Sequence, residues 1–556
     1  MASIIYVSQS TPKAPANAKG AKPVARRSGN YAPSIWSFDF LQSLSSEYTG
    51  EAYKARADML KEAVKILMIP KVGNPLSVLE LVDDLQRLRI SYHFEAEISN
   101  LLEMIYCNYY KSHDEWHKMD LNFKALGFRL LRQRGYPVPQ DIFQNFKDEI
   151  GEMMGVLNLY EASYNSFEGE SILDDARDFT TKYLKENQDK MDESISALVS
   201  HALDTPLHWT MPRVEAKWFM ELYEKRSGMN PTLIELAKLD FNMVQAIYME
   251  DLKHASRWWS NISWDTKLPF ARDRLVECFM WSVGFTYKPQ FSLGRRNLTK
   301  VVAIITTIDD VYDVYGTLDE VEQFTDVSTR WDVNAIQELP DYMQMCFLGL
   351  YSTINEIVYD ILIESGVVTL PYIKKAWADL CTSYLVEARW YHNGYTPTLK
   401  EYLDNGWVSI TGPIILIHIK LSTSITSNEE ILQWFEESYD IVHHVGMLVR
   451  LADDLGTSSS DELARGDTPK SIQCYMNESG ATEDEARTYI NMLIMKTWKK
   501  LNKEQEKAKS QLLREFIDIA MDGVRAAQFT YGKGDGHGRP NTNKSHVQSL
   551  LLNPVV

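Results

Sequence analysis

A run of carboxylates interrupts an apolar segment near the middle of the 556-residue sequence. Asp309, Asp310 and Asp313 stand in the segment VVAIITTIDDVYDVYGT, and no Lys or Arg occurs between residues 301 and 329. On a helix, Asp309 and Asp313 share one face and repel each other, and no local ion pair can offset that repulsion. The flanking Ile and Val residues make the helix apolar nearly all round, so it is expected to be buried, and buried acids need partners. Because hard divalent cations take carboxylate oxygens as ligands, this expectation favours a metal site over a solvated acidic patch.

A second acidic cluster, RLADDLGTSSSDE, follows in the last third of the sequence. Arg450, Asp453, Thr457 and Asp461 are spaced by three, four and four residues, which places a guanidinium, two carboxylates and a hydroxyl along one stripe of a helix. The alternative is a frayed helix end, because a glycine and three serines weaken the helix. This segment alone does not decide between the two interpretations.

Cationic and aromatic side chains accompany these acids. Arg272 and Arg274 precede Asp309 by several helical turns, and arginine binds phosphate in a bidentate manner. An isolated pair of this kind would be interpreted as a surface charge cluster. Trp281 and Tyr531 could present ring faces to a cation, although an aromatic side chain on a helix usually belongs to the core.

The elements that must position these groups are helices. From Glu47 onward the apolar residues recur with a period near 3.6, and no alternating runs indicate a sheet, so the predicted fold class is all-α. Amphipathic helices are predicted over 79–90, 159–183 and 233–259. The segment KRSGMNP, residues 225–231, breaks the helical pattern and predicts a domain boundary.

Composition and charge exclude several classes of protein. The 58 basic residues are outnumbered by 76 acidic ones, for a net charge of −18, which argues against a nucleic-acid partner. The five cysteines are scattered without a CxxC pair and favour a reducing compartment. No apolar run approaches the roughly 18 residues that span a bilayer, so no membrane contact is expected.

The N-terminus differs from the rest of the chain. Residues 1–38 contain no Asp or Glu, yet they hold five Lys and Arg residues among Ser, Ala and Pro. This composition is typical of an organellar transit peptide, with a disordered basic tail as the alternative.

Three motifs, in this order and spacing, resemble the class I terpene synthases of plants: RDR at 272–274, DDVYD at 309–313 and RLADDLGTSSSDE at 450–462. The resemblance extends over almost the whole chain and includes GDGHG at 534–538. In ARRSGNYAPSIW, Arg26, Arg27 and Trp36 match the tandem-arginine and tryptophan motif of the monoterpene synthase type.

The resemblance implies a two-domain fold behind a plastid transit peptide in residues 1–25. Residues 26–226 would form an N-terminal helical α-barrel, and residues 227–556 a C-terminal class I α-bundle with the catalytic site. No DxDD motif for protonation-initiated cyclisation occurs, so the chemistry is expected to begin by ionising a diphosphate. A monomer in the chloroplast stroma is expected, acting on a small-molecule prenyl diphosphate and contacting neither nucleic acid nor membrane.

The implied activity is that of a monoterpene synthase, a lyase that converts geranyl diphosphate into a ten-carbon olefin or alcohol plus diphosphate with three Mg²⁺ or Mn²⁺ ions. The metal residues implied are Asp309, Asp310, Asp313, Asp453, Thr457, Asp461 and Glu462. The substrate-binding residues implied are Arg272, Asp309, Asp313, Arg450, Asp453, Arg26 and Arg27. The catalytic residues implied are Arg272, Arg274, Arg450, Trp281, Tyr531 and Asp535.

The second metal motif departs from the family pattern by one residue. Counting forward from Asp453 and Thr457 leads to Asp461, whereas counting back from Arg465 leads to Glu462. A regular helix favours Asp461, and a one-residue π-bulge at the serines would favour Glu462.

Other functions remain open at this stage. A sesquiterpene synthase acting on farnesyl diphosphate would share the metal residues, whereas a chain-elongating prenyltransferase would need a second DDxxD motif that is missing here. A non-catalytic helical scaffold is the alternative from another class of protein. His443, His444 and His537 are expected to be structural.

Overall fold

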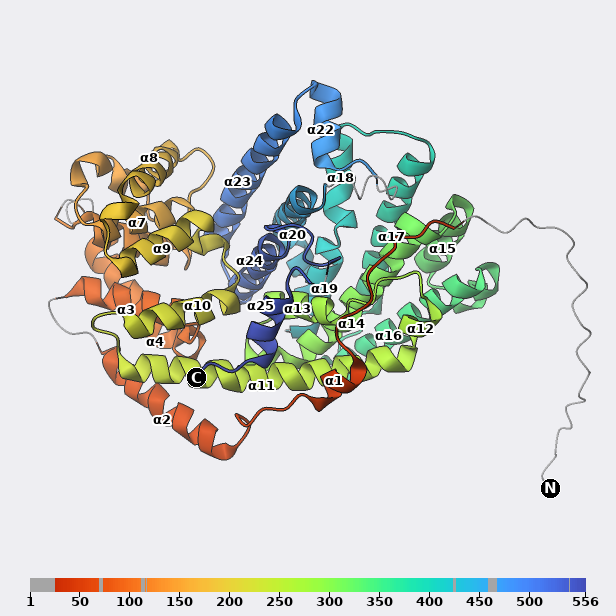
Figure 1. The fold of residues 1–556 in the computed structure, drawn as a ribbon, viewed down its shortest axis with the longest axis horizontal. Coiled ribbons are helices and arrows are strands. Elements are labelled where there is room, and N and C mark those ends of the chain that lie inside the picture. The colour runs from red at the N-terminus through yellow and green to blue at the C-terminus, as the bar shows by residue number, and fades with distance from the viewer. Residues whose placement is uncertain are drawn as a thin grey trace, which may run out of the picture.

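The structure is a computed structural model that describes residues 26–69, 74–111, 116, 118–423, 427–458, 468–539 and 541–556. The predicted transit peptide and both Asp461 and Glu462 lie outside the described residues. Throughout the described ranges the chain forms helices and turns, and its sole β-bridge joins Gly532 to Gly534. The prediction of an all-α fold is confirmed (Figure 1).

The first half of the chain contains α1 (Phe38–Ser43), α2 (Glu51–Leu67), α3 (Pro75–Arg87), α4 (Glu95–Ile105), α6 (Leu121–Arg132), α7 (Met153–Ser163), α8 (Ser171–Asn187), α9 (Glu193–Asp204) and α10 (Pro212–Lys225). The second half contains α11 (Pro231–Ile262), α12 (Trp264–Lys267), α13 (Leu275–Phe285), α14 (Ser292–Asp310), α15 (Leu318–Arg330), α16 (Asp341–Ser365), α17 (Leu370–His392), α18 (Leu399–Ser409), α19 (Gly412–Thr423), α20 (Asn428–Thr457), α22 (Ser471–Ser479), α23 (Glu483–Lys507), α24 (Gln511–Tyr531) and α25 (Lys544–Val547). Short 3₁₀ turns cover Ser91–His93, Gln140–Phe143, Phe146–Glu149, Gln188–Lys190, Leu207–Trp209, Pro289–Phe291 and Val333–Glu338, and π turns cover Tyr106–Tyr110, Val311–Tyr315 and Gln548–Leu552.

Two of the three predicted amphipathic helices are confirmed as α3 and α11, with shifted ends. The prediction of one helix over 159–183 is wrong, because α7 ends at Ser163 and α8 begins at Ser171. Gly169 has a φ of 90° in the connection. This left-handed conformation is one that glycine adopts without strain and that a continuous helix cannot contain.

In the N-terminal half, α6 is the central helix and packs against α3 and α7. It is buried on nearly every side, which requires its cations to have partners. Lys124 pairs with Glu149 at 2.7 Å, and Arg129 pairs with Asp83 at 2.8 Å. These pairs let a helix with charged residues lie inside the barrel.

Helix α11 connects the two halves of the molecule. Gly228, with a φ of 85°, breaks the chain direction, and the Asn230 side chain then accepts hydrogen bonds from the first backbone N–H groups of α11. The helix packs against α2 of the first half and against α13 and α14 of the second, and it runs along one edge of the molecule beneath both (Figure 1). The helix break lies where the sequence predicts it, and the domain boundary at 226/227 stays a prediction.

In the C-terminal half, α13, α14, α17, α18, α19, α20 and α24 pack side by side in a bundle. Large side chains such as those of Phe279 and Trp377 are completely buried in it. Burying a side chain of this size stabilises the fold by about 1.5–3 kcal/mol. The bundle is the part of the molecule that encloses the candidate site.

One helix of the described part, α16, is long and apolar enough to cross a bilayer by length and composition. Its residues Phe347, Leu350, Ile354 and Ile357 are completely buried, and the helix packs against α14. A core helix of a helical bundle meets the same criteria, so the expected lack of membrane contact stays a prediction.

Candidate active site

A cavity of about 210 Å³ lies within the C-terminal bundle. Apolar side chains from α13, α14, α19 and α20 line it, among them Trp281, Val302, Ile305, Ile415 and Val449. The predicted polar residues that also line it are Arg272, Asp309, Asp313, Arg450, Asp453, Thr457, Tyr531 and Asp535. The fold therefore brings together, around one cavity, groups as far apart in the sequence as Arg272 and Asp535.

The first acidic wall lies at the end of α14. The α-helix ends at Asp310 and continues as a π turn over Val311–Tyr315, a distortion that is frequent at functional sites. Asp309 and Asp313 both face the cavity, as predicted from their spacing.

Asp310 differs from the other two acids of this motif. Its side chain is completely buried and is not among the described residues that line the cavity. Its Oδ2 accepts a 2.7 Å hydrogen bond from the backbone N–H of Arg272, and its Oδ1 lies 2.9 Å from the Arg272 Nε. In this structure Asp310 holds Arg272, and its predicted metal role stays a prediction.

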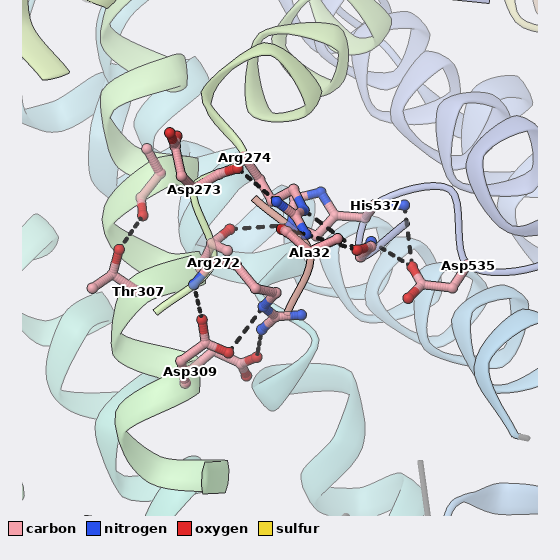
Figure 2. Close-up of polar contacts among 12 residues, drawn as sticks. Ala32, Arg272, Asp273, Arg274, Thr307, Asp309, Asp535 and His537 are labelled. Atoms are coloured by element: carbon pink, nitrogen blue, oxygen red, sulfur yellow. Dashed lines mark hydrogen bonds and ion pairs between the residues drawn. The ribbon is translucent and has the colours of Figure 1, made fainter. Parts of the chain in front are cut away.

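Arg272 provides the compensating charge that the local sequence lacks. Its Nη2 donates to Asp309 Oδ2 at 2.5 Å while the same guanidinium pairs with Asp310. Figure 2 shows Arg272 reaching from its own segment to Asp309 on the neighbouring helix. The partner of the acidic motif thus comes from more than thirty residues upstream.

The second wall is formed by the end of α20. Arg450 pairs with Asp453 and, at 2.8 Å, with Asp454. Tyr402 Oη donates to Asp454 at 2.9 Å, and the backbone N–H of Ser471 donates to the same carboxylate at 3.1 Å. The side chain of Asp454 is completely buried. It fixes Arg450 beside Asp453, which lines the cavity, in the way that Asp310 fixes Arg272 beside Asp309.

Sequence reasoning missed three charged residues of the cavity, Lys470, Glu387 and Arg539. Lys470 Nζ donates to Thr457 Oγ1 at 2.6 Å. Glu387 accepts from Ser409 Oγ at 2.6 Å, and burial raises its pKa. A single acid in the apolar run SYLVEARW of α17 was the one local signal for Glu387, and nothing in the sequence near Lys470 separates it from a surface lysine.

Arg274 does not line the cavity in the described structure. Its side chain is buried, and its Nη2 donates to the backbone oxygens of Ala32 at 2.8 Å and Gly538 at 3.0 Å. Figure 2 shows it turned towards Ala32 and the loop that carries His537. Arg274 thus joins the N-terminal segment, defined as residues 26–36, to the C-terminal loop, and its predicted catalytic role stays a prediction.

The tandem arginines fasten the N-terminal segment to the C-terminal bundle and lie outside the cavity lining. Arg26 Nη2 donates to Glu320 Oε1 at 2.8 Å, and the Arg27 guanidinium lies 4.2 Å from the Tyr391 ring centroid. Although partial burial opposes it, the hydrogen bond from Arg26 lowers the pKa of Glu320 to about 2. Glu320 is therefore the anchor for Arg26.

The remaining predicted residues lie on α13, on α24 and in the loop that follows α24. The rings of Trp281 and Tyr531 are 5.8 Å apart and both face the cavity. Asp535 accepts backbone hydrogen bonds from His537 at 3.1 Å and Gly538 at 2.6 Å. His537, which is expected to be structural, also lines the cavity and shares a 3.2 Å hydrogen bond with Thr306.

His537 nevertheless has the surroundings of an uncharged residue. Burial first and the nearby Arg272 second lower its pKa to about 3, so it is neutral at pH 7. His443 and His444 are not among the described residues that line the cavity, in keeping with a structural role.

The residues present fit divalent metal ions that arrive with a phosphorylated ligand. Among the described residues, no three His, Cys, Asp or Glu side chains already converge on one point as a closed metal cage. Instead Asp309 and Asp313 on one wall, and Asp453 with Thr457 on the other, present oxygen donors to a shared cavity. Mg²⁺ binds in this way, through one or two carboxylates together with substrate phosphates.

Comparison with known families agrees with this geometry. Residues 35–203 match the family described as "Terpene synthase, N-terminal domain", and residues 260–500 match "Terpene synthase family, metal binding domain". A chloroplastic R-linalool synthase of Artemisia annua is 62% identical over 97% of this chain and 96% of its own length.

Two solved structures are similar over nearly the whole chain. A limonene synthase with 2-fluorolinalyl diphosphate is 43% identical, with a TM-score of 0.92 over 96% of this chain and 100% of its own. Isoprene synthase from grey poplar leaves, in complex with three Mg²⁺ ions and dimethylallyl-S-thiolodiphosphate, is 41% identical, with a TM-score of 0.84 over 94% of this chain and 99% of its own. The protein therefore belongs to the terpene synthase family of plants, and within it to the monoterpene synthases.

Proposed function

We propose that the protein converts geranyl diphosphate into a ten-carbon terpene and diphosphate. The observation that supports the proposal is that charged side chains and apolar side chains line the same cavity. Carboxylates and guanidinium groups from α14, α20 and the segment before α13 face the same space as a wall of aliphatic and aromatic side chains. A diphosphate matches the first group, and a short prenyl chain matches the second.

Asp309 and Asp313, together with Asp453 and Thr457, would hold the divalent cations. Three Mg²⁺ or Mn²⁺ ions are proposed by analogy with the grey poplar isoprene synthase, whose structure contains three Mg²⁺ ions. Bound cations supply positive charge where the diphosphate takes up negative charge during departure. Asp461 is the proposed further ligand of the second wall, and Glu462 would replace it if the helix bulges at the serines.

Arg272, Arg450 and Lys470 are placed to receive the diphosphate. The guanidinium groups are already oriented by buried carboxylates on their far side, so little reorganisation is needed when the leaving group binds. Preorganised positive groups of this kind stabilise charge that develops in a transition state. We assign to these three residues the neutralisation of the departing diphosphate.

The organic cation left behind needs a dry environment. Val302, Ile305 and Ile415 exclude water from their part of the cavity wall. The paired rings of Trp281 and Tyr531 offer π faces that attract a cation. The reaction would end by loss of a proton, for which Tyr531 and Asp535 are the nearest predicted residues, or by capture of a water molecule.

The N-terminal segment would close the site during turnover. Its anchors at Arg26, Arg27 and Trp36 support the proposed isomerisation of geranyl to linalyl diphosphate under a closed cover. Linalool is the product to test first, because the Artemisia annua relative is named an R-linalool synthase. We also propose a plastid location, as for that chloroplastic relative, and a monomeric state.

The direct test is incubation of protein beginning near Arg26 with Mg²⁺ and either geranyl or farnesyl diphosphate, followed by gas chromatography of the volatiles. Ten-carbon products from geranyl diphosphate are expected, with little turnover of the fifteen-carbon substrate. Higher turnover of farnesyl diphosphate would instead establish a sesquiterpene synthase. No volatile product from either substrate would contradict the proposed function.

A further inference from the structure

Tyr31 is the one described residue of the N-terminal segment that lines the cavity. The tandem arginines and Trp36 define the motif by which this segment is recognised in the sequence, and Tyr31 lies between them without a predicted role. Its position beside Arg272 and Asp309 in the cavity wall raises the question of what its side chain does there.

Tyr31 contacts both members of the buried ion pair behind the first acidic wall. The Arg272 guanidinium carbon lies 5.0 Å from the centroid of the Tyr31 ring, within the range of a cation–π interaction. The Tyr31 hydroxyl donates a hydrogen bond to the Asp310 carboxylate. Since Arg272 in turn holds Asp309, one side chain from the N-terminal segment is connected to a predicted metal ligand through two successive contacts.

The segment is fastened on both sides of Tyr31. On the N-terminal side, Arg26 pairs with Glu320. On the C-terminal side, Arg274 donates to the Ala32 oxygen at 2.8 Å, and Figure 2 shows Ala32 lying close to Arg274 and Arg272. These anchors restrict the backbone around residue 31 to one path across the site.

Gly29, two residues before Tyr31, lies against the Tyr31 ring. A Cβ atom on Gly29 would lie 2.3 Å from the Tyr31 ring, closer than any real contact. The backbone of the segment therefore packs directly on the ring, which holds it over Arg272.

From these contacts we infer that Tyr31 is a positioning residue that holds the Arg272–Asp310 pair, and through it Asp309, in the arrangement that receives the metal-bound diphosphate. The inference rests on the proposed function and extends it to a residue without an assigned role. It also gives the closed N-terminal segment a specific task, because the pair is fully supported only while the segment lies across the site.

The test compares Tyr31→Phe, which keeps the ring and loses the hydroxyl, with Tyr31→Ala, which loses both. Tyr53→Phe is the matched control, because the Tyr53 hydroxyl reaches only Glu47, at 3.4 Å, near the surface. For each protein, thermal unfolding is measured alone and with Mg²⁺ plus inorganic pyrophosphate, and kcat and KM are measured with geranyl diphosphate.

We expect all variants to unfold near the wild-type temperature without ligand. The stabilisation by Mg²⁺ and pyrophosphate should fall in Tyr31→Phe and fall further in Tyr31→Ala. Because a hydrogen bond to a charged group is lost, kcat should drop about tenfold in Tyr31→Phe, and more in Tyr31→Ala. Tyr53→Phe should match the wild type in every measurement.

Two contrary results are distinguishable. If the wild type responds to Mg²⁺ and pyrophosphate and Tyr31→Ala responds equally, the positioning role is overturned while the proposed function stands. The same holds if Tyr31→Ala loses only its unliganded stability. If the wild type shows neither the stabilisation nor turnover, the proposed function fails, and the role of Tyr31 fails with it.

Discussion

Replacing Asp309 or its neighbour Asp310 by alanine should separate chemistry from stability within one motif. Both carboxylates pair with Arg272, yet the Asp309 side chain is 28% exposed to the cavity, whereas the Asp310 side chain is completely buried. The two substitutions remove the same atoms from adjacent positions, so any difference between them arises from their surroundings.

The expected magnitudes follow from what each change leaves behind. Without Asp309, Arg272 stays paired with Asp310, and the cost should be that of a partly exposed ion pair, about 0–1 kcal/mol. Without Asp310, the buried guanidinium loses its buried partner, and the Arg272 backbone N–H loses its acceptor. The guanidinium keeps its contact with Asp309, so the expected cost is that of the buried donors left without an acceptor, about 1–3 kcal/mol.

Urea denaturation followed by circular dichroism measures the stability difference, and gas chromatography with geranyl diphosphate at saturating Mg²⁺ measures turnover. Asp309→Ala should lose turnover by a factor of about 100 or more, as for removal of a group that stabilises transition-state charge, with nearly normal stability. Asp310→Ala should lose both turnover and stability. Asp326→Ala, which breaks an exposed pair with Arg330 on α15, is the control and should change neither.

Equal stability of Asp309→Ala and Asp310→Ala would refute the argument from the buried pair. Wild-type turnover by Asp309→Ala at saturating Mg²⁺ would refute the assignment of this wall to metal binding. The two refutations are independent, because one concerns folding and the other the reaction.

Three further predictions concern the N-terminal residues, the second metal motif and the Glu320 anchor. Removing residues 1–25 should leave activity unchanged, whereas deletion through Trp36 should lower the rate with geranyl diphosphate and spare that with linalyl diphosphate; equal losses with both substrates would contradict the isomerisation role. Asp461→Ala should raise the Mg²⁺ concentration needed for turnover more than Glu462→Ala does, and the reverse ranking would show that the helix bulges at the serines. Because the folded-state pKa of Glu320 is lowered from 4.5 to about 2, its pairing stabilises the protein above pH 4.5 and is lost as the pH falls towards 2. Wild-type thermal stability should therefore decline more steeply than that of Glu320→Gln between pH 5 and pH 3, and parallel curves would exclude a contribution from the pair.

Local patterns predicted the helical class and the acidic stripes because both depend on neighbours along the chain. The spacing of Asp309 and Asp313 placed them on one face, and they share the cavity even though a π turn begins between them. The break before Pro231 was visible because glycine, asparagine and proline act through their own backbone preferences. The prediction of a single helix over 159–183 was wrong because it relied on periodicity alone. Periodicity does not reveal that Gly169 adopts a left-handed conformation.

The resemblance in motif order predicted the residue set of the site and could not predict how each side chain is used. Asp310 and Arg274 belong to motifs in which Asp309, Asp313 and Arg272 line the cavity. Asp310 instead holds Arg272, and Arg274 binds backbone oxygens. Asp309 faces the cavity and Asp310 does not, because adjacent positions of a helix point in different directions. Which direction is buried depends on the elements packed around the helix.

What the sequence determined by itself was therefore the inventory: an all-α chain, two acidic motifs, an arginine pair before them and a basic leader. Only the tertiary structure decided the partners, because the contacts that matter join segments far apart in the chain. Arg26 meets Glu320, Tyr31 meets Arg272, and Lys470 joins the second wall beside Thr457. The strength of the interaction between two charged groups depends on the distance between them and on how much water separates them. Packing of the helices sets both the distance and the water content, and the sequence alone specifies neither.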